Sequence, residues 1–236
     1  GYDSAGGGNR LFMIDAANGH LLWQINMTAA VPAGVSVLDT DADDYADRMY
    51  AVDVSGLIWR FDIWNGHPTS TLVTGGVVAD LRDLTLGASA APQFFNTPDV
   101  ALIQPRGGTP YYNVAVGSGN PLAGATAATH ERFYAVRDRS PFDARSQASY
   151  DSTPPILFTD LIDVSASTTQ LPPTAPGWTL ALGAGVTGSA VTVNGVVMFT
   201  TFQQTGVSST CVVTGSTQIY AVGIDTEEVS KFQLKV

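Results

Sequence analysis

The sequence predicts an all-β protein, and three observations support this prediction. Short apolar or alternating runs recur along the 236 residues, whereas helical periodicity is scarce. Gly, Pro, Asn or Asp interrupts these runs roughly every ten residues. The 24 Gly and 13 Pro suit a chain of many short strands joined by turns.

Each candidate strand is an apolar or alternating run bounded by turn residues. In chain order they are Arg10–Asp15, Leu21–Ile25, Gly34–Leu38, Arg48–Val54, Leu57–Ile63, Tyr111–Gly117, Arg132–Val136, Ile156–Leu161, Trp178–Leu182, Val196–Thr201, Gln218–Val222 and Ser230–Leu234. Three longer stretches lack the pattern and are expected to be irregular. They are residues 64–110, 137–155 and the region around 162–177.

Two of the predicted hairpins resemble each other. One runs from Leu11 to Trp23 and the other from Met49 to Trp59, and their starts lie 38 residues apart. Each has an aromatic residue second in its first strand, an Asp at the end of that strand, a turn with Gly and then Trp. Partial copies occur at Phe133–Val136 and Ile219–Val222. The spacing is typical of one propeller blade, although any β-rich chain can contain similar hairpins.

These hairpins predict a partial or modified β-propeller built from quinoprotein-like blade hairpins. A complete propeller of six or more blades would need more residues than 236, given the irregular stretches. We expect residues 1–236 to form a single propeller-like domain with four to six blades or part-blades. We further expect it to be a fragment of a larger C-terminal propeller.

The charge of the chain limits its partners. The net charge is −10, from 11 Lys and Arg against 21 Asp and Glu, which disfavours nucleic acid and anionic lipid surfaces. The same charge is compatible with divalent cations. No apolar run approaches the roughly 18–20 residues that a membrane helix needs, so no membrane insertion is expected. The single cysteine, Cys211, allows no internal disulfide.

A nine-residue acidic loop is the sharpest local signal. Its carboxylates occupy positions 1, 3, 5 and 9, which are Asp39, Asp41, Asp43 and Asp47. Calcium prefers about six to eight oxygen ligands, and the carbonyl of Tyr45 at position 7 would add one. Carboxylates packed this closely repel one another unless a cation lies among them. The loop therefore predicts one Ca²⁺ site.

The loop differs from the helix–loop–helix calcium motif. That motif has Gly at position 6 and Glu at position 12, where this chain has Asp44 and Tyr50. The flanking segments are also strands, which suits a short loop in a hairpin. A solvated acidic loop is the alternative, and magnesium is less favoured because it demands octahedral geometry.

Signals of enzymatic chemistry are weak, so we expect no enzyme. His20, His67 and His130 are scattered without ligand spacing. The segment from Asn113 to Asn120 resembles a Gly-rich phosphate loop, but no helix follows it, and a strand ending in a turn is expected. No nucleophile motif is evident. The four tryptophans, Trp23, Trp59, Trp64 and Trp178, are expected to pack in the core.

The segment from Asp39 to Asp62 resembles the C-terminal domain of the PilY/PilC family of type IV pilus tip-associated adhesins and biogenesis factors. Members typically have a calcium loop followed by a D-R-x-Y-x-G-D-x-x-G-x-x-W-R-F-D strand pair. Weaker matches extend over residues 9–225, including Val114–Gly119 and Arg132–Asp138. Asp44 and Ala51 stand where Gly is common, and Cys211 lacks a second cysteine nearby.

The resemblance implies a modified β-propeller and a calcium ion held by Asp39, Asp41, Asp43, Asp47 and the Tyr45 carbonyl. It implies an extracellular position at the bacterial cell surface, at the pilus tip and associated with the outer membrane. The partners would be pilus components such as minor pilins, and host or abiotic surfaces. The expected role is calcium-dependent control of pilus extension and retraction, twitching motility and attachment.

Two other functions compete with this expectation. A quinoprotein-like propeller enzyme would explain the Phe12–Trp23 hairpin, although no adjacent cysteine pair or charged cofactor cluster accompanies it. An integrin-like calcium-binding interaction propeller would explain the loop, but it predicts several such loops and the sequence has one. Reconstitution with the quinone and calcium would test the enzyme.

Overall fold

The computed structural model describes residues 1–2, 7–87, 91–120, 130–166, 171–207, 213–224 and 231–235. Within these ranges the chain is rich in strands, and its helices are the short α1 (Gln147–Ser152) and η3 (Phe158–Asp160). The prediction of an all-β protein is confirmed. Among the described residues, no helix has the length and hydrophobicity needed to cross a bilayer.

The described strands form one hairpin and three larger sheets. The N-terminal hairpin pairs β1 (Arg10–Ile14) with β2 (Leu21–Asn26). The first sheet has the order β10-β6-β5-β4-β3, with β3 (Ser36–Leu38), β4 (Arg48–Val52), β5 (Leu57–Ile63), β6 (Val73–Asp80) and β10 (Ile156–Leu157). The second has the order β11-β12-β9-β8-β7, with β7 (Asp99–Ile103), β8 (Tyr111–Gly117), β9 (Arg132–Asp138), β11 (Ile162–Asp163) and β12 (Gly177–Ala181).

The third sheet contains β13 (Gly185–Val186), β14 (Val191–Val193), β15 (Val196–Val207), β16 (Val213–Gly223) and β17 (Lys231–Lys235). Both β13 and β14 pair with β15, which continues through β16 to β17. In the described part of the chain none of the sheets closes on itself. The arrangement of the sheets as propeller blades remains a prediction.

Every candidate strand overlaps a strand of the structure, but the stretches expected to be irregular are partly regular. Both β6 and β7 lie within residues 64–110, α1 lies within 137–155, and β11 lies within 162–177. The prediction was wrong for β6 because Gly75 and Gly76 interrupt its apolar pattern. A side chain at Gly75 would collide with Phe61 on β5, so the glycine allows close approach of the two strands.

The internal similarity of the two hairpins is also present in the structure. Met13 pairs with Trp23 across the N-terminal hairpin, and Ala51 pairs with Trp59 at the corresponding place in the first sheet. In both copies the Asp that directly follows the first strand accepts a hydrogen bond from the backbone N–H two residues later. The two hairpins therefore share this pairing as well as their sequence pattern, although the first has a register shift between Met13 and Ile14 that the second lacks.

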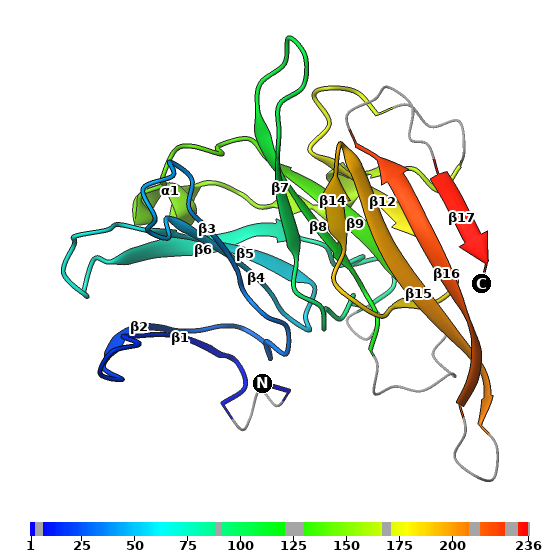
Figure 1. Cartoon of the computed structure of the whole chain (residues 1–236), viewed down its shortest axis with the longest axis horizontal. Helices are drawn as coiled ribbons and strands as arrows, with labels where there is room; N and C mark the ends of the chain where they lie inside the picture. The colour runs from blue at the N-terminus through cyan, green and yellow to red at the C-terminus, as the bar shows by residue number, and fades with distance from the viewer. Residues whose placement is uncertain are drawn as a thin grey trace.

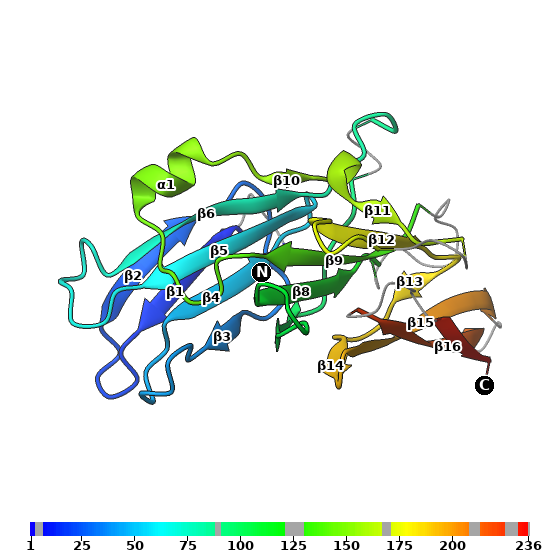
Figure 2. The same cartoon turned by 90° about the horizontal axis from the view of Figure 1, so that it is seen from above.

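The hairpin and the three sheets are stacked side by side in chain order (Figures 1 and 2). An apolar layer fills each of the three junctions. Rings dominate the junction between the second and third sheets, where Phe133 stacks on Phe199 at a centroid distance of 3.8 Å. Trp178 is 1% exposed there and Trp59 is 8% exposed beside the hairpin, which confirms core packing for both.

Candidate metal-binding loop and the ionic network beside it

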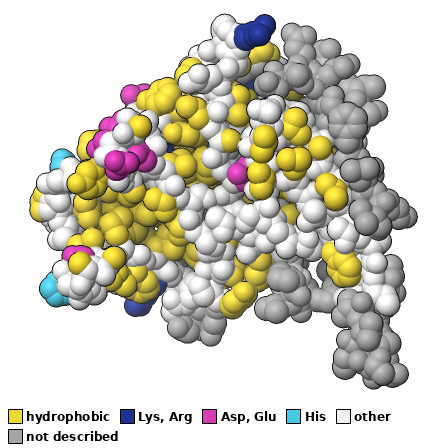
Figure 3. All heavy atoms as spheres, in the orientation of Figure 1, with side chains coloured by type: hydrophobic (Ala, Val, Ile, Leu, Met, Phe, Trp, Pro, Cys, Tyr) yellow, Lys and Arg dark blue, Asp and Glu magenta, His cyan; other side chains and the backbone are white. Residues whose placement is uncertain are grey.

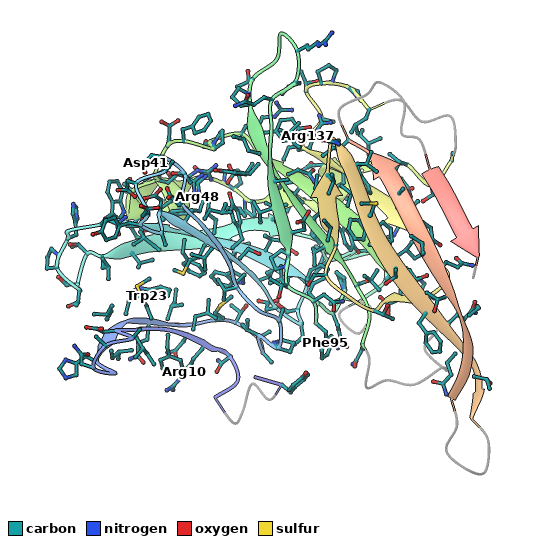
Figure 4. The ribbon with its side chains drawn as sticks, viewed as in Figure 1. Arg10, Trp23, Asp41, Arg48, Phe95 and Arg137 are labelled. Carbon is teal, nitrogen blue, oxygen red and sulfur yellow. The ribbon has the colours of Figure 1, made fainter. Side chains whose placement is uncertain are left out.

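The acidic loop joins the end of β3 to the start of β4. Its base is closed by the Asp47 N–H, which donates to the Leu38 carbonyl at 2.8 Å, and by the Ile63 N–H, which donates to the Asp47 carbonyl at 2.7 Å. Asp41 and Arg48 lie at this end of the first sheet, and acidic side chains gather on the surface there (Figures 3 and 4). Strand pairing thus fixes both ends of the loop.

Within the loop, the Asp39 carboxylate organises the backbone. It accepts hydrogen bonds from the N–H groups of Ala42 at 2.7 Å and Asp44 at 3.0 Å. Ala42 and Asp44 have φ values of 65° and 71°, a left-handed conformation that Asp tolerates better than Ala. Partial desolvation opposes ionisation of Asp39, but these hydrogen bonds outweigh it and hold its pKa below the ordinary value.

Asp39, Asp41 and Asp43 are brought together by this turn. Each offers a carboxylate oxygen, these oxygens lie within 4.8 Å of one another, and all three residues are exposed. Partial desolvation and the neighbouring charges, led by Asp43 and Asp47, raise the pKa of Asp41 above its ordinary value. Holding these negative charges close together costs free energy, and a bound cation would lower that cost. No other group of this kind occurs in the described part of the chain.

Asp47 is placed differently from the other predicted ligands. Its Oδ2 accepts from the backbone N–H of Thr40 at 2.7 Å and from the Thr40 hydroxyl at 2.9 Å. Its Oδ1 accepts from Asn65 Nδ2 at 3.2 Å. The structure therefore gathers Asp39, Asp41 and Asp43 and uses Asp47 to fasten the loop. The Tyr45 side chain is 65% exposed.

The donor set of the loop consists of oxygen atoms, with no Lys or Arg salt-bridged to its carboxylates in the described residues. Hard cations such as Ca²⁺ prefer such ligands, and Ca²⁺ tolerates irregular geometry better than Mg²⁺ does. The residues present therefore fit calcium. Asp39, Asp41 and Asp43 would hold the ion, and Asp47 retains one unused lone-pair site, on its Oδ1.

A buried ionic network begins one residue after the loop. Arg48 Nε donates to Asp62 Oδ1 at 2.7 Å, and Arg60 Nη2 donates to the same oxygen at 2.9 Å. Arg60 Nη1 reaches Asp138 Oδ2 on β9 of the second sheet at 2.8 Å. Arg48 is 2% exposed, while Arg60 and Asp62 are 0% exposed, so this is a fully desolvated set of alternating charges.

Two tyrosines and a chain segment complete the network. The Tyr50 hydroxyl donates to Asp138 at 2.6 Å, and the Tyr150 hydroxyl donates to Asp62 at 2.7 Å. Arg48 also donates to three carbonyls of the strap, a segment comprising residues 138–146; these are the carbonyls of Ser140, Pro141 and Asp143. Because buried charges are tolerated only when fully hydrogen-bonded, this network ties the strap to the first sheet.

The electrostatics of the network follow from its pairing. Burial alone raises the pKa of Asp138, but the Arg60 charge and the Tyr50 hydroxyl outweigh it, so the pKa lies below its ordinary value. Burial is the main cause that raises the pKa of Tyr150. Tyr150 therefore remains a neutral donor and Asp138 remains a charged acceptor at neutral pH.

Another polar residue of the segment 39–62, Asp53, shapes a turn. Asp53 is 0% exposed and accepts from the Ser55 N–H at 2.9 Å and from the Trp59 indole N–H at 3.0 Å. Gly56, in the same turn, has a φ of 90°. The segment from 48 to 62 is thus mainly structural, and only the acidic loop offers exposed ligands.

Sequence reasoning missed several residues of this region. Thr40 and Asn65 contact Asp47, and Asp138 and Tyr150 complete the buried network. The alternating Asp pattern carries no information about them, because all except Thr40 come from other parts of the chain. The Gly-rich segment expected to be a strand ending in a turn contains β8, which confirms the strand, whereas residues 118–120 after it form no regular turn. Cys211 lies outside the described residues.

Fold and loop together define an all-β protein of stacked, mainly antiparallel sheets with an acidic, metal-compatible loop in one hairpin. Comparison with known protein families finds no match to this sequence. Comparison with curated protein sequences also finds none.

Among solved structures, the chain is similar to the crystal structure of the Pseudomonas aeruginosa PilY1 C-terminal domain, with a TM-score of 0.66 and 19% sequence identity. The match covers 94% of this chain and 54% of that chain, so this chain spans about half the length of its structural neighbour. At this identity the likeness establishes a shared fold.

Proposed function

We propose that this chain is a calcium-binding, non-enzymatic domain of a type IV pilus biogenesis factor or tip adhesin. The observation that carries the proposal is the fold likeness to the PilY1 C-terminal domain over 94% of the chain. The gathering of Asp39, Asp41 and Asp43 within 4.8 Å supports the calcium part, because these oxygens suit that ion.

In this proposal the stacked sheets are blades of a partial or modified propeller. The protein acts outside the cell, at the pilus tip and the outer membrane, and engages minor pilins and host or abiotic surfaces. One ion binds per chain through Asp39, Asp41, Asp43 and Asp47, with the Tyr45 carbonyl as a further ligand. The ion regulates pilus extension and retraction, and with them twitching motility and attachment.

Calcium is proposed to order the loop locally and to leave the fold unchanged. The base of the loop is fixed by strand hydrogen bonds, while its tip carries exposed carboxylates that repel one another. A bound cation offsets this repulsion and fixes one surface beside the first sheet. That surface is the part of the molecule through which calcium would control the pilus.

Calorimetry and hydrogen exchange test this proposal. Titration with calcium should give a stoichiometry near one ion per chain, and hydrogen exchange should show calcium-dependent protection confined to about residues 34–53. The absence of binding heat together with equal exchange in calcium and in chelator would refute the calcium part. In cells, loss of the loop carboxylates should alter twitching, and normal twitching by such a strain would refute the pilus part.

A further inference from the structure

Asn65 is the residue outside the loop whose side chain contacts it most directly among the described residues. It lies in the turn between β5 and β6, 18 residues after Asp47. Its Nδ2 donates to the Ala46 carbonyl and to Asp47 Oδ1, both at 3.2 Å. The spacing of the acidic residues gives no indication of this contact, which depends on the β4–β5 pairing.

The turn that carries Asn65 is itself fastened to the sheet. The Trp64 N–H donates to the Leu72 carbonyl at 2.7 Å, and the Trp64 indole donates to the Thr74 hydroxyl at 2.9 Å. Gly66 follows with a φ of 82°, a conformation in which glycine carries no steric cost. The Asn65 amide is therefore presented from a fixed backbone.

Asp47 receives donors on both carboxylate oxygens. Thr40 holds Oδ2 through its N–H and its hydroxyl, and Asn65 holds Oδ1. The first contact lies within the loop, whereas the second connects the loop to another hairpin. The Asn65 amide is neutral, so it orients the carboxylate without adding a charge to a loop that already carries clustered carboxylates.

We propose that Asn65 is a positioning residue of the calcium loop, which acts through Asp47 by fixing the direction of its carboxylate. This inference rests on the proposed calcium function. Residues that orient metal ligands typically contribute about 10–100-fold to metal affinity. Because Asn65 is exposed and its two contacts are 3.2 Å long, the expected contribution is at the lower end, about tenfold.

The test measures calcium affinity by calorimetry on the 236-residue chain and its variants. Asn65→Ala should weaken binding about tenfold. The matched control is Asn18→Ala, because Asn18 also precedes a glycine in a hairpin turn and donates to the Asp15 carboxylate at 2.7 Å. That hairpin carries no acidic loop, so the control should bind calcium like the wild type. Melting of the metal-free variants checks that each is folded.

A double-mutant cycle separates positioning from a general structural role. In an Asp47→Ala background, Asn65→Ala should cause no further loss of calcium affinity, because the carboxylate it orients is gone. Equal losses in both backgrounds, or no loss in the wild-type background, would overturn the inference while calcium binding itself stands. A wild-type chain that binds no calcium would refute the proposed function first, and the inference with it.

Discussion

Two clusters of carboxylates lie next to each other in this protein. They differ in how exposed they are and in whether the chain supplies cationic partners for them. The loop exposes Asp39, Asp41 and Asp43 without a cationic side chain as partner among the described residues. The network that begins at Arg48 buries its carboxylates and pairs each with guanidinium groups. In the proposed function a cation from solution would offset the charge of the loop, whereas the network obtains its cations from the chain.

The same comparison divides residues 39–62 into an exposed acidic loop and a buried structural part. Most of its polar positions after residue 47 are buried and hydrogen-bonded to one another or to the strap. The pKa shifts differ accordingly. The pKa of Asp41 in the loop is raised above its ordinary value, whereas the pKa of Asp138 in the network is lowered. This division predicts four effects of decreasing size.

The largest effect is expected when one partner of the buried network is removed. Arg60→Ala leaves Asp62 and Asp138 buried without their shared cation, which should cost about 3–5 kcal/mol of unfolding free energy. Urea denaturation measures this change. Arg82→Ala is the matched control: it breaks an Arg–Asp pair at the surface with Arg82 43% exposed, and should cost at most about 1 kcal/mol. Similar losses in the two variants would contradict the distinction between buried and exposed pairs.

The next effect is that of calcium on the loop. At a concentration about 100 times its dissociation constant, calcium should raise the unfolding free energy by about 2.7 kcal/mol if it binds only the folded chain. Chelation should lower the melting temperature of the wild type, and it should lower that of Asp39→Ala or Asp47→Ala by less, because each variant keeps a weakened calcium site. Both variants should remain folded, since the core strands bury their apolar surface independently of the loop. Either variant binding calcium at wild-type strength would remove that residue from the ligand set.

A smaller loss of stability is expected when a tyrosine hydroxyl is removed from the buried network, and none when one is removed from the loop. Tyr50→Phe removes the donor to Asp138 and should cost about 1.5 kcal/mol, because a buried carboxylate loses one hydrogen bond but keeps that from Arg60. Tyr45→Phe in the loop removes a hydroxyl from a residue that is 65% exposed and should leave stability unchanged. Thermal unfolding of the two variants side by side checks the contrast. Equal destabilisation would show that the loop tyrosine has a structural partner.

The smallest effect concerns pH. The folded-state pKa of Asp138 lies below its unfolded value of about 3.9, so its stabilising contribution is present above that value. The contribution is lost as the pH falls through the folded pKa. Asp138→Asn should therefore weaken the dependence of stability on pH below about 4, measured by urea denaturation between about pH 5 and 3. An unchanged slope would show that other carboxylates dominate acid unfolding.

The sequence by itself determined the local features of this protein. Alternating apolar residues bounded by turn residues located the strands, because the side-chain period of a strand is a property of the chain alone. The spacing of Asp39, Asp41 and Asp43 located the acidic turn, because its hydrogen bonds form within a few residues. The similarity of the two hairpins, with Trp23 and Trp59 at equivalent positions, is likewise contained in the residue pattern.

Tertiary structure decided everything that joins distant segments. Arg60 meets Asp138 across 78 residues, and Tyr150 meets Asp62 across 88, contacts that no local spacing encodes. The glycines of β6 interrupt the apolar pattern of the sequence, but Gly75 allows this strand to lie close to Phe61 on β5. The fastening of Asp47 by Asn65 depends on two hairpin ends meeting at one edge. The physical reason is common to all: periodicity and turn chemistry act over a few residues, whereas burial and charge pairing depend on which surfaces the fold brings together.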